Sequence, residues 1–279
     1  MPELPDLEVL ARSMESALRG RVIAAVEANQ PKCLNLPPAE MAERLRGQRI
    51  GGVGRRGKWA LLALDDGSTL ALNLGMGGEA RLHPPDAAPD PGRERVVICF
   101  EDGWQLWVHH WWFGHVHHVP PGQLDAHPQI GTLGVEPLSD AFTVEWLADA
   151  LRGRRGRIKG YLLDQRVIAG IGNVYVQDAL WRARLHPERK ANTLTPDEIR
   201  ALHGGIQTTL REGIDAGGGP SEQDVHGNPG RYMERIQVGY RTGEPCPRCG
   251  TLVKEVRVGQ TNSYICPACQ PLEPPEETP

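Results

Sequence analysis

Two pairs of cysteines near the C-terminus constrain the fold of this chain more than any other feature. Cys246 and Cys249 form one CxxC pair and Cys266 and Cys269 form a second, with residues 250–265 between them. This spacing is typical of a zinc ribbon, in which two hairpin turns present four thiolates to one tetrahedral ion. Because the protein would supply all four ligands, we expect one structural Zn²⁺ with no position for a reactive water. Two disulfides are the alternative, but nothing in the sequence marks the chain as secreted.

Length and composition narrow the class of protein. The chain has 279 residues, enough for two modest domains with a core each. No apolar run approaches the roughly 18 residues that a membrane span requires. The first residues, MPELPDLEVL, carry acids where a secretory signal would carry Lys or Arg. We therefore expect a cytoplasmic protein that does not bind a membrane.

The net charge of −4 does not by itself suggest a protein that binds nucleic acid. The distribution of charge matters more than its sum. Residues 152–190 hold ten Arg or Lys against three acids, and residues 44–58 hold six Arg or Lys and no acid. Acids collect elsewhere, including the tail 271–279, which we expect to be disordered. Two basic segments on a mildly acidic chain favour a surface for a specific polyanion.

The spacing of apolar residues divides the first half of the chain into a helix and a β-rich part. Residues 5–19 have apolar side chains at helical intervals, which predicts an amphipathic helix. From residue 21 to about 119, short β-rich runs alternate with turn residues such as DDGS (65–68) and EDGW (101–104). Regular short strands with such turns predict a β-sandwich.

Helical patterns dominate the second half. Residues 141–152 are predicted to form one helix and residues 193–214 another. Thr195 would cap the second of these helices, with Glu198 completing a capping box. The Gly-rich segment 217–230 is predicted to be a long loop, and loops of this length are usually functional or disordered.

The segment 168–187, IAGIGNVYVQDALWRARLHP, closely resembles the helix–two-turn–helix signature of the formamidopyrimidine-DNA glycosylase and endonuclease VIII family. A GIGN turn that leads into a helix can hold a phosphate through its exposed amides, but alone it is a weak signal. Followed by the two CxxC pairs, it becomes specific. Further similarities to the family are PELPDLE at the N-terminus, RRGKWALL (55–62), LGMGGEARL (74–82) and GEPCPRCG (243–250).

This resemblance runs nearly from end to end and implies a multidomain α+β fold. The expected parts are an N-terminal catalytic β-sandwich with a leading helix in residues 1–122 and a helix–two-turn–helix DNA-binding domain in residues 135–235. A Cys₄ zinc finger in residues 236–270 and the acidic tail 271–279 would follow. The family binds damaged DNA in the cleft between its domains, which implies a nucleoid-associated bacterial protein, and we expect a monomer.

The resemblance implies a bifunctional DNA glycosylase and abasic-site lyase that acts on oxidised or otherwise damaged bases. Pro2 matches the family's nucleophile, a secondary amine once Met1 is removed, which forms a Schiff base that permits β- and δ-elimination. An α-amino group titrates near pH 8, so a sizeable fraction is neutral at about pH 7. Glu3 matches the acid/base residue, and Lys58 matches a hairpin lysine that holds a phosphate near the lesion.

The resemblance also implies a DNA-binding surface. A base must rotate out of the duplex before its C1′ can be attacked, and Met76 matches the residue that fills the gap. A core methionine is the alternative for this position. The other matched positions are Trp112 and Phe113 in the intercalation loop, Lys159 and Asn173 as phosphate contacts, Tyr240 in the zinc linker, and the loop 217–232 over the everted base.

This sequence departs from the family in ways that leave its substrate open. Thr261 stands where the family has a phosphate-gripping arginine, and Trp112 stands where an arginine reads the orphaned base. Asp6 and Asp178 replace glutamates. The alternative function is therefore a lesion- or branched-DNA-binding protein of the same fold with weak or lost turnover. An RNA-binding zinc ribbon would explain the cysteines but not PELPDLE or GIGN.

Two further sets of residues invite a chemical role that we do not expect them to have. The stretch HHWWFGHVHH (109–118) holds five of the ten histidines and raises the possibility of a second metal site. Alternating strand positions explain it more simply. Cys33 and Cys99 lie in β-rich sequence and are predicted to be core residues, not reactive thiols.

Overall fold

The computed structural model describes residues 1–220 and 223–272. The chain divides into two compact units, one of residues 1–132 with 214–232 and the other of residues 133–213 with those from 233 onward. Most of the predicted tail, residues 273–279, lies outside the described residues, and the predicted domain boundaries stay predictions. Within the described ranges, no helix is long and apolar enough to cross a membrane.

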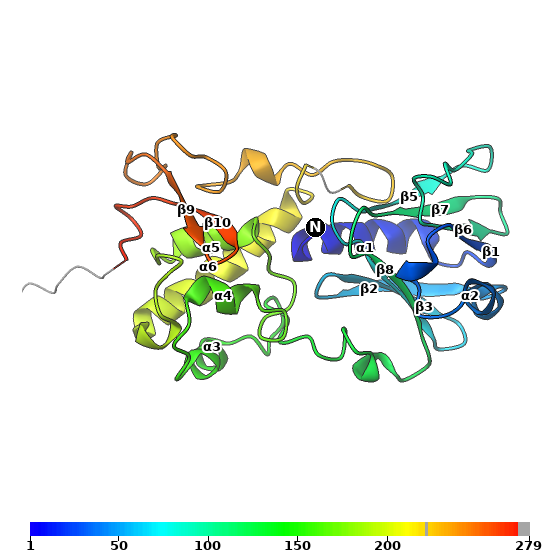
Figure 1. Cartoon of the computed structure of the whole chain (residues 1–279), viewed down its shortest axis with the longest axis horizontal. Coiled ribbons are helices and arrows are strands. Elements are labelled where there is room, and N and C mark those ends of the chain that lie inside the picture. Colours follow the sequence, from blue (N-terminus) through cyan, green and yellow to red (C-terminus); the bar gives the residue numbers. More distant parts are fainter. Residues whose placement is uncertain (221–222, 273–279) are drawn as a thin grey trace, which may run out of the picture. The chain divides into compact units, whose positions relative to one another are not determined.

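The first unit is a sandwich of two four-stranded antiparallel sheets (Figure 1). The predicted hairpins at DDGS and EDGW are confirmed, because β3 pairs with β4 and β6 pairs with β7. One sheet has the order β1 (Ile23–Ala28), β6 (Val96–Phe100), β7 (Gln105–His109) and β5 (Glu79–His83). The other has the order β2 (Ile50–Arg56), β3 (Trp59–Leu64), β4 (Thr69–Asn73) and β8 (His115–Val119).

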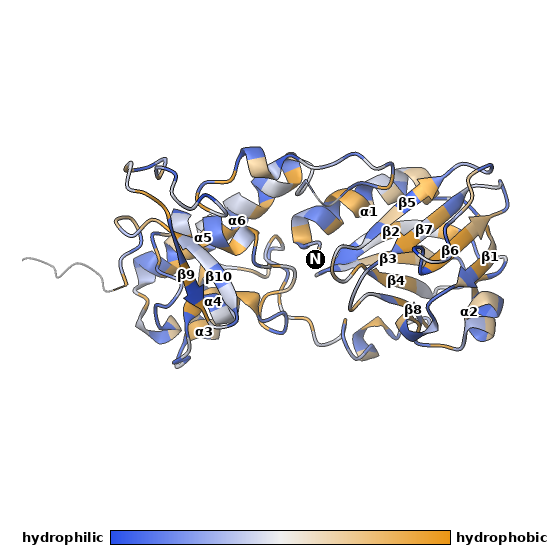
Figure 2. Ribbon diagram, turned by 45° about the horizontal axis from the view of Figure 1, so that its top comes forward, coloured by the Kyte–Doolittle hydropathy of each residue, from blue (hydrophilic) through white to orange (hydrophobic). Residues whose placement is uncertain are grey.

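Two helices cover the sandwich. The helix α1 (Leu4–Leu18) packs against β2 and β3 with the apolar face that its sequence predicts, and α2 (Pro38–Leu45) packs against β1. The strands β1, β3, β4 and β6 are largely apolar, and Figure 2 colours much of them as hydrophobic. Cys33 lies in this core as predicted, whereas Cys99 on β6 is only half-buried.

The second unit carries helices α3 (Val144–Leu151), α4 (Ile158–Leu163), α5 (Tyr175–Arg182) and α6 (Pro196–Asp215). The predicted capping box of α6 is confirmed, since the Glu198 amide donates to Thr195 Oγ1 (3.2 Å) and the Thr195 amide donates to Glu198 Oε2 (2.8 Å). A hairpin of β9 (Lys254–Val258) and β10 (Thr261–Ile265) completes this unit, with β10 packed on α5.

Two buried histidines fasten the segment after β8 to the sandwich. His127 Nδ1 accepts hydrogen bonds from the amides of Gln129 (3.3 Å) and Ile130 (3.1 Å), so its proton sits on Nε2. That nitrogen lies 2.9 Å from Nδ1 of His117, which must therefore accept. Each ring is thus a neutral imidazole with a defined tautomer. Among the described residues, no group of three or more histidines is placed to hold a metal ion.

Acid is expected to weaken this histidine pair. Burial, with the neighbouring His115 and His127 adding to it, lowers the pKa of His117 from its ordinary value of 6.5 to about 4, and burial also lowers the pKa of His127. The unfolded chain therefore binds these protons at a higher pH than the folded one, so the stability is complete above about pH 6.5 and is lost as the pH falls through about 4.

Urea unfolding across this pH range measures the effect. We expect His117→Phe, which removes the titrating ring, to lessen the slope of unfolding free energy against pH by up to one proton, about 1.4 kcal/mol per pH unit. The exposed His226 serves as the control site, and His226→Gln should leave the slope unchanged. Identical pH profiles for His117→Phe and the unmodified protein would show that His117 is not the acid-sensitive group.

Candidate active site and nucleic-acid interface

The N-terminus is fixed in place by the first turn of α1. Pro2 and Glu3 are buried, and Leu4 and Leu7 anchor the turn in or beside the core. Glu3 is the N-cap with an extended backbone (φ −105°, ψ −175°), and its amide donates to Asp6 Oδ2 at 2.7 Å in a capping box. A side chain or amine at this end is therefore held at a defined position instead of fraying.

The two aspartates that replace family glutamates both accept backbone amides. In the first unit, Asp6 Oδ1 accepts from the amide of Gly219 (2.9 Å) and so ties the loop after α6 to the start of α1. In the second unit, Asp178 accepts from the amides of Gln237 (2.8 Å) and Val238 (3.0 Å). At both positions the aspartate carboxylate holds the backbone of a segment that is distant in the sequence.

Lys58 lies in the tight turn between β2 and β3, where Gly57 adopts a positive φ of 54°. Burial lowers the pKa of Lys58, while the negative charges of Glu3 and Asp6 act in the opposite direction. The ammonium group therefore lies within electrostatic range of the two carboxylates at the start of α1. The structure thereby brings Lys58 together with the N-terminal residues, which lie more than fifty positions away in the sequence.

Two loops of the sandwich pair with each other and expose apolar side chains. The Met76 amide donates to the carbonyl of Trp112 (2.9 Å), and the Trp111 amide donates to the carbonyl of Met76 (3.1 Å). Met76 is 49% exposed, Trp112 67% and Phe113 75%, so the alternative of a core methionine is wrong. Trp111, at 60% exposure, belongs to the same surface, although its sequence position alone indicates no role for it.

Close packing of the backbone explains the glycines of these loops. Gly75 has a φ of 55°, and a Cβ there would lie 2.1 Å from the Trp112 carbonyl oxygen. A Cβ on Gly114 would lie 2.2 Å from the buried ring of His110. Phe113 itself has a φ of 58°, in the left-handed region that a phenylalanine rarely occupies. The exposed side chains thus stand on a constrained backbone.

Lys159 does not have the environment that we predicted. It is 1% exposed, and its Nζ donates to the carbonyl of Asn262 and to Oγ of Ser263, both at 2.7 Å. Burial lowers its pKa to about 8. The prediction of a phosphate contact is therefore wrong for this structure, because the ammonium group is enclosed and holds the β9–β10 hairpin instead.

Gln177 on α5 is a second link to this hairpin, and it was missed in the sequence. Its Nε2 donates to the carbonyl of Asn173 (2.9 Å) in the GIGN turn and to that of Asn262 (3.2 Å), and its Oε1 accepts from the Tyr264 amide (3.2 Å). The turn and the hairpin are thereby joined within the second unit. Asn173 remains half-buried at the start of α5.

The remaining predicted contact residues lie at or near the surface of the second unit. Tyr240 is 45% exposed, has a φ of 59° and packs its ring 4.8 Å from that of Tyr264. Thr261 turns its hydroxyl back to the carbonyl of Val258 (3.4 Å) in its own hairpin. The turn of this hairpin therefore carries no charged side chain where the family has an arginine.

The basic segment 152–190 is less positive in the structure than in the sequence. Lys159 is buried, and five arginines pair with acids of the same unit, which leaves a smaller positive surface than the sequence suggests. The pairs are Arg152–Asp149, Arg157–Glu188, Arg166–Asp164, Arg182–Glu212 and Arg189–Glu198.

The four predicted zinc ligands converge. The sulfur atoms of Cys246, Cys249, Cys266 and Cys269 all lie within 4.8 Å of one another, with separations of 3.4 to 4.0 Å for the hydrogen-bonded pairs. A tetrahedral ion with Zn–S bonds of about 2.3 Å requires separations of about 3.8 Å. Trp181 Nε1 donates to the Cys246 sulfur at 3.4 Å. The donor set fits one structural zinc ion, and no ligand position is left over.

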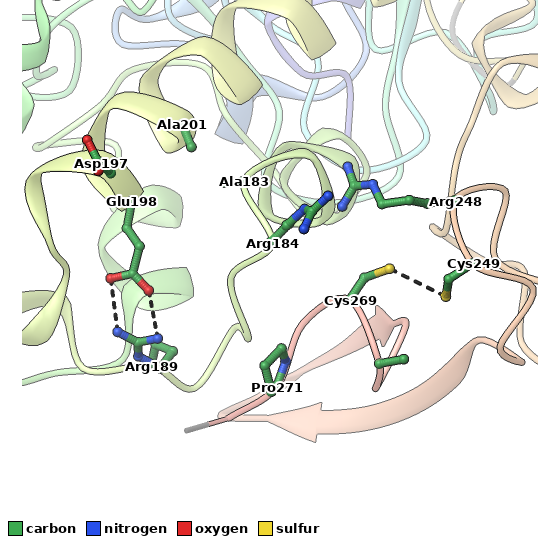
Figure 3. Close-up of a pocket in the computed structure, with 11 residues that line it drawn as sticks. Ala183, Arg184, Arg189, Asp197, Glu198, Ala201, Arg248, Cys249, Cys269 and Pro271 are labelled. Carbon is green, nitrogen blue, oxygen red and sulfur yellow. Dashed lines mark hydrogen bonds and ion pairs between the residues drawn. The ribbon is translucent and has the colours of Figure 1, made fainter. Parts of the chain in front are cut away.

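A pocket of about 530 Å³ lies beside these cysteines (Figure 3). Arg184 and Arg248 approach each other across it, whereas Arg189 is committed to Glu198. Arg248 stacks over the ring of Trp181 at 4.1 Å. A Zn²⁺ ion held by four thiolates would carry two net negative charges. The guanidinium groups of Arg184 and Arg248 would lie near that charge. The pocket is therefore part of the zinc site.

Comparisons with known proteins agree with this architecture. Residues 1–111 match the formamidopyrimidine-DNA glycosylase N-terminal domain, residues 133–224 match the H2TH domain of the same enzyme, and residues 243–272 match the zinc finger found in FPG and IleRS. Three family descriptions thus account for most of the chain, in the order that the sequence predicts.

Relatives and solved structures match over nearly the whole chain. The formamidopyrimidine-DNA glycosylase of Pelotomaculum thermopropionicum is 42% identical over 277 residues (98% of this chain, 100% of the relative), and that of Bacillus subtilis is 36% identical over 275 residues (97% and 99%). A Lactococcus lactis Fpg complex with abasic-site DNA has a TM-score of 0.89 at 32% identity (96% of this chain, 99% of that chain). With this coverage, the chain belongs to the formamidopyrimidine-DNA glycosylase family.

Proposed function

We propose that this protein is a DNA glycosylase that removes damaged bases and then cleaves the strand at the abasic site, with Pro2, Glu3 and Lys58 as its catalytic residues. The observation that carries the proposal is the fixed start of α1, whose carboxylates act electrostatically on the half-buried Lys58. Damaged DNA as substrate is supported by the Lactococcus lactis Fpg structures, whose titles name abasic-site DNA and Fapy-dG DNA.

The chemistry begins at the N-terminal amine. After removal of Met1, the Pro2 nitrogen attacks C1′ of the damaged nucleoside, and the bond from C1′ to the base breaks as the base departs with the electron pair. Glu3 protonates the sugar ring oxygen as the ring opens to an iminium. The iminium acidifies C2′, whose proton passes to the Glu3 carboxylate as the bond from C3′ to its phosphate oxygen breaks and the phosphate departs with the electron pair. Lys58 holds a phosphate beside the lesion.

The other proposed residues bind DNA. Met76, Trp112 and Phe113 fill the gap that the everted base leaves, and Asn173 and Tyr240 contact phosphates from the second unit. The loop 217–232 covers the everted base, although residues 221 and 222 lie outside the described part of the chain. The protein works as a monomer on nucleoid DNA, and sedimentation of the complex with a short damaged duplex would give its stoichiometry.

Glu3→Gln tests the function and the assignment of the acid together. We expect release of an oxidised base from duplex DNA to slow by about 10²- to 10⁴-fold, the range of general acid catalysis, because glutamine cannot donate the proton. Nicking of a preformed abasic site should slow less, since the base is already gone. The measurement is single-turnover cleavage of both substrates, with Glu43→Gln on the exposed face of α2 as the matched control. Equal losses on both substrates would contradict this role of Glu3.

A second candidate function is a lesion- or branched-DNA-binding protein with little turnover. Thr261 and Trp112 motivate it, because both replace arginines that would contact DNA in this family. Borohydride reduction of a mixture with abasic DNA separates the two functions. A covalent adduct requires a competent amine, whereas a protein that only binds DNA gives none.

A further inference from the structure

The two paired loops of the sandwich form an exposed surface of three aromatic rings and one thioether. We call Met76, Trp111, Trp112 and Phe113 the stacking surface; each is at least 49% exposed. Exposed apolar side chains that occur singly are ordinary, but four on two paired loops mark a binding site. The ligand must therefore have flat apolar faces that cover these side chains.

Close packing against Gly77, His109 and His110 fixes the position of the stacking surface. The indole of Trp111 covers Gly77, where a Cβ would lie 2.6 Å from its Cδ1, and it meets the ring of His109 edge-on at 4.8 Å. The loop after Trp111 rests on the ring of His110, which is 6% exposed. A platform fixed before binding loses little conformational entropy when a planar group stacks on it.

The stacking surface is joined to the proposed catalytic residues. Asn73, at the end of β4, donates from Nδ2 to the carbonyl of Lys58 (3.0 Å) and accepts the amide of Gly75 at Oδ1 (3.1 Å). One side chain thus connects the turn of Lys58 to the loop of Met76. The planar groups next to a base under attack at this site are other nucleobases.

The second unit presents less positive charge at its surface than the sequence suggests. The zinc hairpin presents Thr261 where the family has an arginine, five arginines of segment 152–190 are paired with acids, and the net charge is −4. An arginine discriminates among bases through bidentate hydrogen bonds. Tryptophan has a single N–H donor and a broad face, and stacking tolerates any base.

We propose that the stacking surface binds unpaired nucleobases, so that the substrates of this enzyme include lesions in mismatched, bubble and single-stranded DNA. This inference rests on the proposed glycosylase function and names its substrate class. A base without a partner pays no cost of unpairing before it stacks on Trp111 or Trp112. The identity of the opposite base therefore has little influence on binding.

Binding of DNA that contains a tetrahydrofuran abasic analogue, which cannot react with the amine, tests the proposal without catalysis. The analogue is placed in a single strand, in a bubble and in duplexes opposite each of the four bases. We expect the four duplex affinities to differ by less than about fivefold, the smallest discrimination that a bidentate contact supplies. Single-strand and bubble affinities should be no weaker than those of the duplexes.

Variants identify the residues responsible. Trp111→Ala and Trp112→Ala should each weaken binding to the single strand by about 5- to 160-fold, the range of one base–aromatic stack. They should leave the slope of log affinity against log salt unchanged, because no phosphate contact is lost. Trp146→Phe on α3 is the control indole. Trp112→Arg should introduce a preference among the four opposite bases.

A strong preference for one opposite base in the unmodified protein would overturn the proposal. So would full single-strand binding by Trp111→Ala and Trp112→Ala. These outcomes are distinct from a failure of the proposed function. A protein that cleaves none of the corresponding true abasic DNAs yet binds the analogues as expected keeps the stacking surface and loses the lyase.

Discussion

Blocking the N-terminal amine is expected to abolish the borohydride-trapped adduct with abasic DNA. The Schiff base requires a free amine at Pro2, and an uncleaved N-terminal extension converts this nitrogen into an amide that cannot form it. Strand cleavage should fall to the uncatalysed background. Pro2→Gly retains an amine but makes it primary and more mobile, so adduct formation should slow without disappearing.

Gel analysis of the reduced mixture measures both effects. The control carries the same extension followed by a protease site, so that cleavage restores proline as the first residue. This control is needed because Pro2 and Glu3 are buried, and a change at this end of the chain also affects the packing of α1. Recovery of the adduct after cleavage would separate chemistry from folding. If the uncleaved protein trapped DNA as well as the cleaved one, another amine would be the nucleophile, with the half-buried Lys58 as the next candidate.

Loss of one zinc ligand is expected to have the largest effect on structure. Cys246→Ser should reduce the zinc content from one ion per chain to none and unfold the β9–β10 hairpin, because structural zinc contributes about 10–16 kcal/mol to folding of such modules. Binding of abasic DNA should weaken with it, since Tyr240 and the hairpin share this unit. Elemental analysis and DNA binding measure the two effects.

Cys99→Ser, a half-buried cysteine on β6, is the matched control and should keep both zinc and DNA binding. A Cys246→Ser protein that retained stoichiometric zinc would show that the four cysteines are not the ligand set. Retention of full DNA affinity without zinc would place the interface entirely outside the hairpin.

The sequence was sufficient for those elements whose signals are local. The capping box of Thr195 and Glu198, the two hairpin turns and the cysteine spacing each depend on residues a few positions apart. The strand β2 (Ile50–Arg56) was not delimited, because IGGVGRR lacks an alternation of apolar and polar residues and gains its strand conformation by pairing with β3. The six-residue α4 is too short for a helical period to be visible.

The site was less predictable where function depends on distant partners. Met76 and Trp112 are exposed, as the prediction that they contact DNA requires. That Trp111 lies on the same surface follows only from the pairing of the two loops. Lys159 shows the opposite error, because lysine is almost always exposed unless paired. Its enclosure comes from Asn262 and Ser263, about a hundred residues further along the chain.

The carboxylate of Asp6 makes the start of α1 and the loop after α6 mechanically dependent on each other. One of its oxygens holds the Glu3 amide and the other holds the amide of Gly219. A displacement of that loop at Gly219 removes one acceptor interaction and frees the carboxylate to rotate, which loosens a cap worth about 1 kcal/mol. Substitutions in this loop would then slow the chemistry in addition to any effect on binding of the everted base, because the loop also sets the position of the nucleophile.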